Sequence, residues 1–135
     1  MKKLIYLVLT VLIVACSSDD SSSSLTFFEK YDRVVWQESG TEYVYRIQYI
    51  NGNTITVKYF EGYSGDEYCE SETLSNSDLI EVTENSFRFN EQDDVDFWVT
   101  TVTAVNNGNN LIVEYSDEPE YSENYSRTGL NTACD

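Results

Sequence analysis

Histidine is absent from the 135 residues, and basic residues are scarce, with 8 Lys and Arg against 24 Asp and Glu. Without histidine, a Ser-His-Asp catalytic triad and a histidine metal site are excluded. The net charge of −16 argues against nucleic acid as a partner, because phosphates require clusters of Lys and Arg. The same charge opposes docking of the protein surface on anionic lipid headgroups.

Proline and glycine are also rare, with one proline and six glycines, so the chain is not a low-complexity segment. Aromatic residues make up 14% of the sequence, and 11 of them are tyrosines, which favour β-strands. No glycine-rich phosphate loop occurs. We therefore expect a non-catalytic protein without a cofactor. A hydrolase that uses two of the abundant carboxylates is kept as an alternative.

No hydrophobic run is long enough to span a bilayer, which takes about 20 residues. The run at residues 4–15 follows two lysines and has the length of a signal-peptide core. It ends in Leu12-Ile13-Val14-Ala15-Cys16, which resembles the bacterial lipobox. The resemblance implies that Cys16 is diacylated and becomes the first residue of the mature protein. An ordinary cleaved signal with an incidental cysteine is the alternative.

Residues 17–24 are serine and aspartate only, and without an apolar side chain they predict a flexible tether. Asp19 and Asp20 resemble the acidic surface-export signal of Bacteroidetes lipoproteins, and a plain acidic linker is the alternative. The chain is thus divided into a signal peptide (1–15), an acylated cysteine with its tether (16–24) and a β-barrel domain (25–135). The lipobox implies a cell-envelope lipoprotein of the outer membrane, and the export signal would place it on the cell surface. The expected partner is the membrane itself, which the protein would contact through acylated Cys16.

Two cysteines remain when Cys16 is acylated, namely Cys69 and Cys134. Such a pair in an exported protein predicts a disulfide. It would close a loop of about 65 residues, worth roughly 4 kcal/mol in the chain-entropy model. Two cysteines without histidine make a poor zinc site.

The sequence of residues 25–135 predicts an all-β, antiparallel meander of about eight strands that closes into a small barrel. Thr26 and Glu29 have the spacing of a capping box and predict one short N-terminal helical turn. The clearest strand pair is residues 43–49 and 55–59, where the odd positions are apolar and Asn51-Gly52 marks the turn. The other predicted strands are residues 34–36, 68–74, 79–83, 87–89, 97–103 and 111–115. The tail from Asp117 is polar, without a predicted strand.

Phe28-Glu29-Lys30-Tyr31-Asp32, followed by Val35-Trp36 and preceded by Cys-Ser-Ser-Asp-Asp, resembles the lipocalin-like lipoproteins of Flavobacteria and other Bacteroidetes. In a lipocalin a short helical turn precedes a tryptophan on the first strand. The resemblance implies that Trp36 seals the closed end of the barrel. Lipocalins usually place glycine two residues before this tryptophan, where this chain has Val34. The family suggests a fold and a location more than an activity.

The inward face of the 43–59 hairpin carries four tyrosines, which are candidate ligand-binding residues: Tyr43, Tyr45, Tyr49 and Tyr59. They would line a pocket for a small apolar or amphipathic ligand, or else fill an aromatic core. A second hypothesis is a surface module that contacts carbohydrate or protein through outward aromatics: Phe60, Trp98, Tyr121 and Tyr125. Asp93, Asp94 and Asp96 are weak metal candidates, because they lack the spacing and glycine of a calcium loop. We therefore expect no metal.

Overall fold

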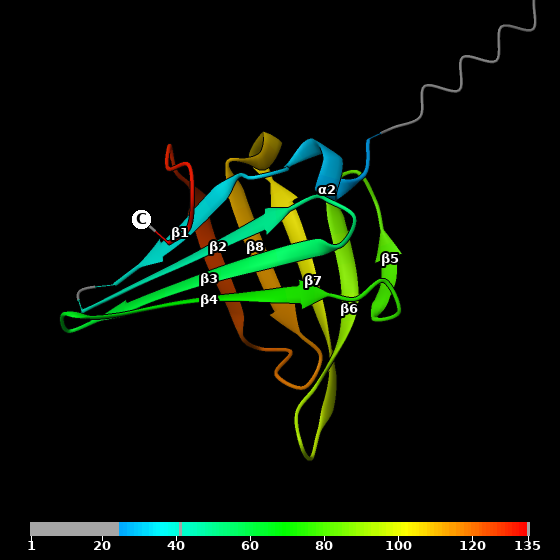
Figure 1. The fold of residues 1–135 in the computed structure, drawn as a ribbon. Helices are drawn as coiled ribbons and strands as arrows, with labels where there is room; N and C mark the ends of the chain where they lie inside the picture. Colours follow the sequence, from blue (N-terminus) through cyan, green and yellow to red (C-terminus); the bar gives the residue numbers. More distant parts are fainter. Residues whose placement is uncertain (1–24, 41, 135) are drawn as a thin grey trace, which may run out of the picture.

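The computed structural model describes residues 25–40 and 42–134, and its elements carry the labels of Figure 1. The predicted signal peptide, Cys16 and the tether lie outside these residues. The described chain contains α2 (Phe27–Lys30), a 3₁₀ turn η1 (Asn106–Gly108) and nine strands. The strands are β1 (Val35–Ser39), β2 (Tyr43–Ile50), β3 (Ile55–Tyr63), β4 (Asp66–Leu74), β5 (Leu79–Val82), β6 (Ser86–Gln92), β7 (Phe97–Val105), β8 (Asn110–Tyr115) and β9 (Ser122–Arg127).

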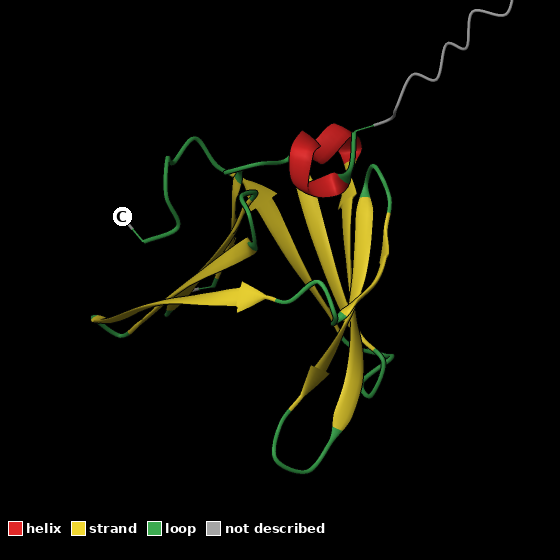
Figure 2. Ribbon diagram, turned by 45° about the vertical axis from the view of Figure 1, so that its right-hand side comes forward, coloured by secondary structure: helices red, strands yellow, loops and turns green. Residues whose placement is uncertain are grey.

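All nine strands belong to one antiparallel sheet in the order β4-β3-β2-β1-β9-β8-β7-β6-β5. The sheet curls into a half-barrel (Figures 1 and 2). The first strand, β1, pairs with the last strand, β9, so neither is an edge of the sheet. The two edges are β4 and β5, which follow each other in the sequence but are not paired. The predicted all-β antiparallel meander with one short helical turn is confirmed. The strand count is nine rather than about eight.

The additional strand is β9, in the tail for which no strand was predicted. Its sequence, Ser-Glu-Asn-Tyr-Ser-Arg, contains one strong β-former, Tyr125. Pairing makes it a strand: β9 runs antiparallel to β8 from Asn110–Ser126 to Glu114–Ser122, and it meets β1 at Trp36–Arg127. Two neighbouring strands satisfy its backbone groups, so the tertiary ladder overrides its weak local preference.

The β2–β3 hairpin has the predicted inward face. Ile47, Tyr49, Ile55 and Val57 are buried on one side of the sheet. The loop at residues 51–54 is longer than a two-residue turn, since Ile50 pairs with Thr56. The tight turn lies between β3 and β4, where Ser64 and Gly65 have φ of 50° and 93°. Two consecutive positive φ angles are what a type I′ hairpin turn requires.

The helix α2 covers one end of the half-barrel (Figure 2). Its start is held by the predicted capping box, in which the Thr26 backbone N–H donates to the Glu29 carboxylate at 2.8 Å. Phe27 is fully buried and packs on Trp36 and Phe87, with ring centroids 6.2 and 4.9 Å away. Trp36 is itself fully buried, and its indole N–H donates to the Gly108 carbonyl at 3.3 Å. An aromatic plug therefore fills this end.

The chain after β9 folds back over the outer face of β1, β2 and β3. Gln48 points outward from β2 and is buried beneath this C-terminal segment. Its side-chain amide N–H donates to the Asn131 carbonyl at 3.1 Å, and its side-chain oxygen accepts from the Ala133 N–H at 3.3 Å. Beyond Ala133 the sulfurs of Cys69 and Cys134 meet in a disulfide, with Cα atoms 5.7 Å apart. The structure thus supports the predicted cysteine pairing.

Candidate functional site

A cavity of about 280 Å³ lies on the inner face of the sheet. The cavity is on the far side of the core from α2. Phe87 and Leu111 lie near the starts of β6 and β8 and pack in the core. Glu91 and Tyr115 lie near the ends of the same strands and line the cavity. Its apolar lining includes Ile47, Phe89 and Val113. The polar lining consists mainly of four tyrosines and three glutamates: Tyr49, Tyr59, Tyr115, Tyr125, Glu72, Glu91 and Glu123.

Two of these tyrosines offer hydroxyls that the protein itself does not use. Tyr49 is only 2% exposed, yet within the described chain its hydroxyl forms no hydrogen bond, and neither does that of Tyr59. Among the described residues, every fully buried side-chain oxygen or nitrogen has a hydrogen-bond partner. Since the Tyr49 oxygen has none, it is not fully buried, and it is exposed to the cavity that Tyr49 lines. A phenol hydroxyl at a cavity surface can both donate and accept a hydrogen bond. Both hydroxyls are therefore available to an occupant of the cavity.

The glutamates are held by hydrogen bonds from their neighbours. One oxygen of Glu91, Oε2, accepts from the Trp98 indole N–H at 2.9 Å and also from the Thr100 hydroxyl. Glu123 accepts from the Tyr125 hydroxyl at 2.5 Å. Burial, and then the neighbouring Glu123, raise the pKa of both Tyr115 and Tyr125, while burial raises the pKa of Tyr49 and Tyr59. All four phenols are therefore neutral hydrogen-bonding groups at physiological pH.

Further carboxylates surround this end of the half-barrel. Burial, and then the charge of Glu123, raise the pKa of Glu38 on β1. The carboxylate of Glu61 is close enough to Tyr45 to raise the pKa of that tyrosine. No Lys or Arg is among the residues that line the cavity. The site is consequently an acidic one.

The structure divides the four tyrosines predicted to bind a ligand. Tyr49 and Tyr59 line the cavity, whereas Tyr43 and Tyr45 do not. Tyr45 packs at the margin of the core, and its ring lies 4.9 Å from that of Tyr43, which borders a groove elsewhere. All four share one face of the hairpin, but they differ in their position along the barrel axis. That ligand contacts involve Tyr49 and Tyr59 stays a prediction.

Sequence reasoning missed the other half of the lining. Tyr115 follows Leu111 and Val113 at alternating positions of β8, and this period-2 pattern was a usable signal for its inward direction. Tyr125 was predicted to face outward and Glu123 carried no prediction, because β9 itself was not predicted. Glu91 carried no site prediction, although it alternates inward with Phe87 and Phe89 on β6.

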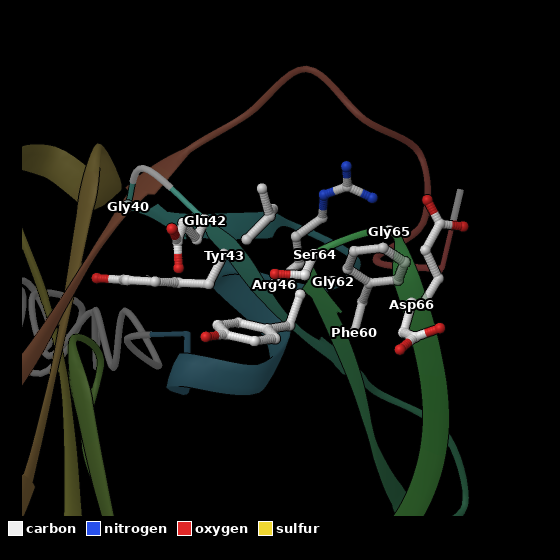
Figure 3. A pocket seen from close by; sticks show the side chains of 12 residues that line it. Gly40, Glu42, Tyr43, Arg46, Phe60, Gly62, Ser64, Gly65 and Asp66 are labelled. Atoms are coloured by element: carbon white, nitrogen blue, oxygen red, sulfur yellow. The ribbon is translucent and has the colours of Figure 1, made fainter.

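A second hollow, of about 490 Å³, lies at the outer end of β2, β3 and β4 (Figure 3). Tyr43, Phe60 and Tyr63 supply its aromatic rings. Its cation, Arg46, lies over the Phe60 ring at 4.4 Å and donates to the Ala133 carbonyl at 3.3 Å. The guanidinium is therefore engaged by the C-terminal segment, and it contributes to the structure of this face.

The aromatics proposed for surface contact do not face outward together. Phe60 is buried on the outer face, Tyr125 lines the inner cavity, and Trp98 is partly buried against Glu91. Tyr121 is 51% exposed and stacks on Tyr115, with ring centroids 6.3 Å apart.

The aspartates of the β6–β7 turn serve its geometry. One Asp93 oxygen, Oδ1, accepts from the backbone N–H of Val95 and of Asp96 at 2.8 and 2.7 Å, and these bonds lower the pKa of Asp93. Asp94 and Asp96 are exposed. In the described part of the chain, no three His, Cys, Asp or Glu side chains are grouped closely enough to hold a metal ion.

Comparison with known proteins identifies no relative: no family model, curated protein or solved structure matches this chain. Over residues 25–40 and 42–134, no helix has the length and apolar character needed to cross a bilayer.

Proposed function

We propose that the protein is a lipid-anchored, non-catalytic binding module of the bacterial cell envelope, which holds a small amphipathic ligand in the cavity of its half-barrel. Three features support this function: the lipobox resemblance at Cys16, the plug of aromatic residues at the α2 end, and the hollow beyond it.

The observation that carries the proposal is the Tyr49 hydroxyl. It belongs to a side chain that is 2% exposed, it faces the cavity, and in the described chain nothing accepts from it or donates to it. Native proteins satisfy the great majority of their buried polar groups. This hydroxyl is therefore free to form a hydrogen bond with a ligand in the cavity.

The lining also defines the kind of ligand. A volume of about 280 Å³ lies at the lower limit of ordinary ligand pockets, so the ligand must be small. Ile47, Phe89 and Val113 offer it apolar contact, whereas the tyrosine hydroxyls and carboxylates offer hydrogen bonds. An amphipathic molecule matches both halves of this lining better than a wholly apolar one.

The start of the described chain and the cavity are at opposite ends of the domain. The described chain begins just before α2, which covers the plugged end, and the cavity lies on the other side of the core. With Cys16 acylated, the plugged end would face the bilayer and the cavity would be directed away from it. Ligand could then enter without displacing the domain from the membrane.

The ligand hypothesis is tested with a pair of tyrosine-to-phenylalanine variants purified from the native host. Native mass spectrometry of the wild-type protein should show a bound small molecule that is released on denaturation. Tyr49→Phe should lower its occupancy, with an affinity loss of about tenfold for one hydrogen bond. The stability of this variant should stay within about 0.5 kcal/mol of the wild type, because the removed hydroxyl has no partner in the protein.

Tyr31→Phe is the matched control. The Tyr31 hydroxyl donates to the Asn85 side chain at 3.1 Å, outside the cavity, so its loss should cost about 1 kcal/mol of stability and leave occupancy unchanged. A wild-type protein without any bound molecule would contradict the cavity function. The surface-contact hypothesis would then be favoured, with the groove of Figure 3 as its site.

The anchor is tested separately by mass spectrometry of the mature N-terminus. We expect a chain that begins at Cys16 and carries acyl groups. A mature chain that begins at another residue, or an unmodified Cys16, would contradict the lipoprotein assignment without affecting the cavity.

A further inference from the structure

We infer that the ligand of the cavity is a small organic cation, an amine joined to a compact apolar body, with its ammonium group directed at Glu91 and Glu123. This inference rests on the proposed function and names the chemical class of the ligand.

Charge is the first argument. Glu72, Glu91 and Glu123 all line the cavity, and no cationic side chain is among its lining residues. A ligand carboxylate placed there would meet three negative charges without a compensating one. Glu38 on β1 adds a fourth carboxylate beyond the lining, and burial, followed by the charge of Glu123, raises the pKa of Glu38.

Hydrogen-bonding capacity is the second argument. Both bonds that Glu91 receives within the described chain, from Trp98 and Thr100, go to the same oxygen, Oε2. Its other oxygen keeps its capacity to accept. An ammonium group carries three donors and no acceptor, so it matches a carboxylate that is only partly used. Charge-assisted bonds of this kind are also stronger than bonds between neutral groups.

The tyrosines complete the argument, because they add no charge that would oppose a cation. The hydroxyls of Tyr49 and Tyr59 can accept a hydrogen bond from an amine, and tyrosine rings attract a nearby cation through their electron-rich faces. Ile47 and Val113 then provide contacts for the apolar body of the ligand. The lining thus has a polar acidic part and an apolar part, as an amphipathic amine requires.

Three probes of similar size but different charge test the inference. Isothermal titration of the full folded domain at pH 7 would compare 2-phenylethylamine, 2-phenylethanol and 3-phenylpropanoate. The amine should bind at least about tenfold more tightly than the alcohol, the equivalent of one charge-assisted hydrogen bond. The carboxylate should bind most weakly of the three.

Charge-removing variants locate the site of binding. Glu91→Gln should weaken amine binding by about tenfold and leave alcohol binding unchanged. Because Glu91 also receives two internal hydrogen bonds, Glu72→Gln serves as a second variant on another strand. Glu114→Gln is the control, since it removes the same charge from an exposed position that does not line the cavity. It should leave amine affinity unchanged.

The outcomes separate this inference from the function on which it rests. If the alcohol or the carboxylate binds as well as the amine, or if none of the three binds, the cationic ligand is overturned. An equal loss of amine affinity in Glu114→Gln and Glu91→Gln would also overturn it, because general attraction by the acidic protein would then explain the binding. The cavity function itself is decided by native mass spectrometry and Tyr49→Phe, whatever the charge of the ligand.

Discussion

Trp36 shows how much of the closed end depends on single residues. Its indole lies between Phe27 and Tyr31, and its N–H reaches the Gly108 carbonyl at 3.3 Å. Gly108 has a φ of 78°, and a Cβ placed there would come within 2.4 Å of the Tyr31 ring. Both the conformation and the space at this position therefore require glycine. The indole, the tyrosine and the glycine stabilise one another.

We expect Trp36→Ala to lower the free energy of unfolding by about 3–5 kcal/mol, because it leaves a large void among fully buried rings. Trp36→Phe should cost less, since it keeps much of the ring volume and loses the bond to Gly108. Urea denaturation followed by circular dichroism measures both values. Equal stability of wild type and Trp36→Ala would show that the indole is not part of the core.

At the scale of elements, the C-terminal segment after β9 acts as a cover for the outer face. It buries Val35 and Phe60 beneath Ala133, and the Gln48 side chain binds it through Asn131 and Ala133. Without this cover, Gln48 and Phe60 would be exposed on the sheet. The disulfide holds the end of the cover to β4, where Cys69 lies opposite Phe60.

Removing the disulfide should destabilise the protein by about 2–4 kcal/mol, because the bond closes a long loop that restricts the unfolded chain. Cys69→Ser, Cys134→Ser and the double variant should lose the same stability within error, since each one removes the same bond. Thermal unfolding under oxidising conditions measures the three variants. Labelling of both thiols in the native protein would contradict the pairing.

At the scale of the whole molecule, the pairing of the strands determines between which two strands the half-barrel is open. The first and last strands, β1 and β9, join in the middle of the sheet, so the unpaired edges are β4 and β5. Eight of the nine residues of β4 are exposed, whereas Leu111 and Val113 on β8 are buried. The half-barrel is therefore better protected at β8 than at its β4 edge.

Hydrogen exchange should resolve this difference. Backbone amides of β4 should exchange at least about tenfold faster than those of β8, because an edge strand opens without disrupting the rest of the core. Peptide-resolved exchange monitored by mass spectrometry measures both strands in one experiment. Equal protection of β4 and β8 would indicate that the β4 edge is covered by a further pairing.

The sequence by itself determined the features that depend on neighbouring residues. Alternation of apolar and polar positions defined the β2–β3 hairpin, and the Thr26–Glu29 spacing defined the capped turn. The inward direction of Tyr49 and Tyr59 follows from the same period of two. The disulfide between Cys69 and Cys134 could be predicted because these are the two cysteines that remain when Cys16 is acylated in an exported chain.

The tertiary structure alone decided the features that join distant segments. β9 is a strand because β1 and β8 flank it, and the pairing of its backbone outweighs the weak β-preference of its residues. Tyr49 and Tyr43 lie on one face at opposite ends of β2, yet only Tyr49 lines the cavity, because residues of β6 to β9 complete the lining only at the Tyr49 end. Glu91 on β6 and Glu123 on β9 line the same cavity although β7 and β8 separate their strands in the sheet, and no local pattern encodes this arrangement.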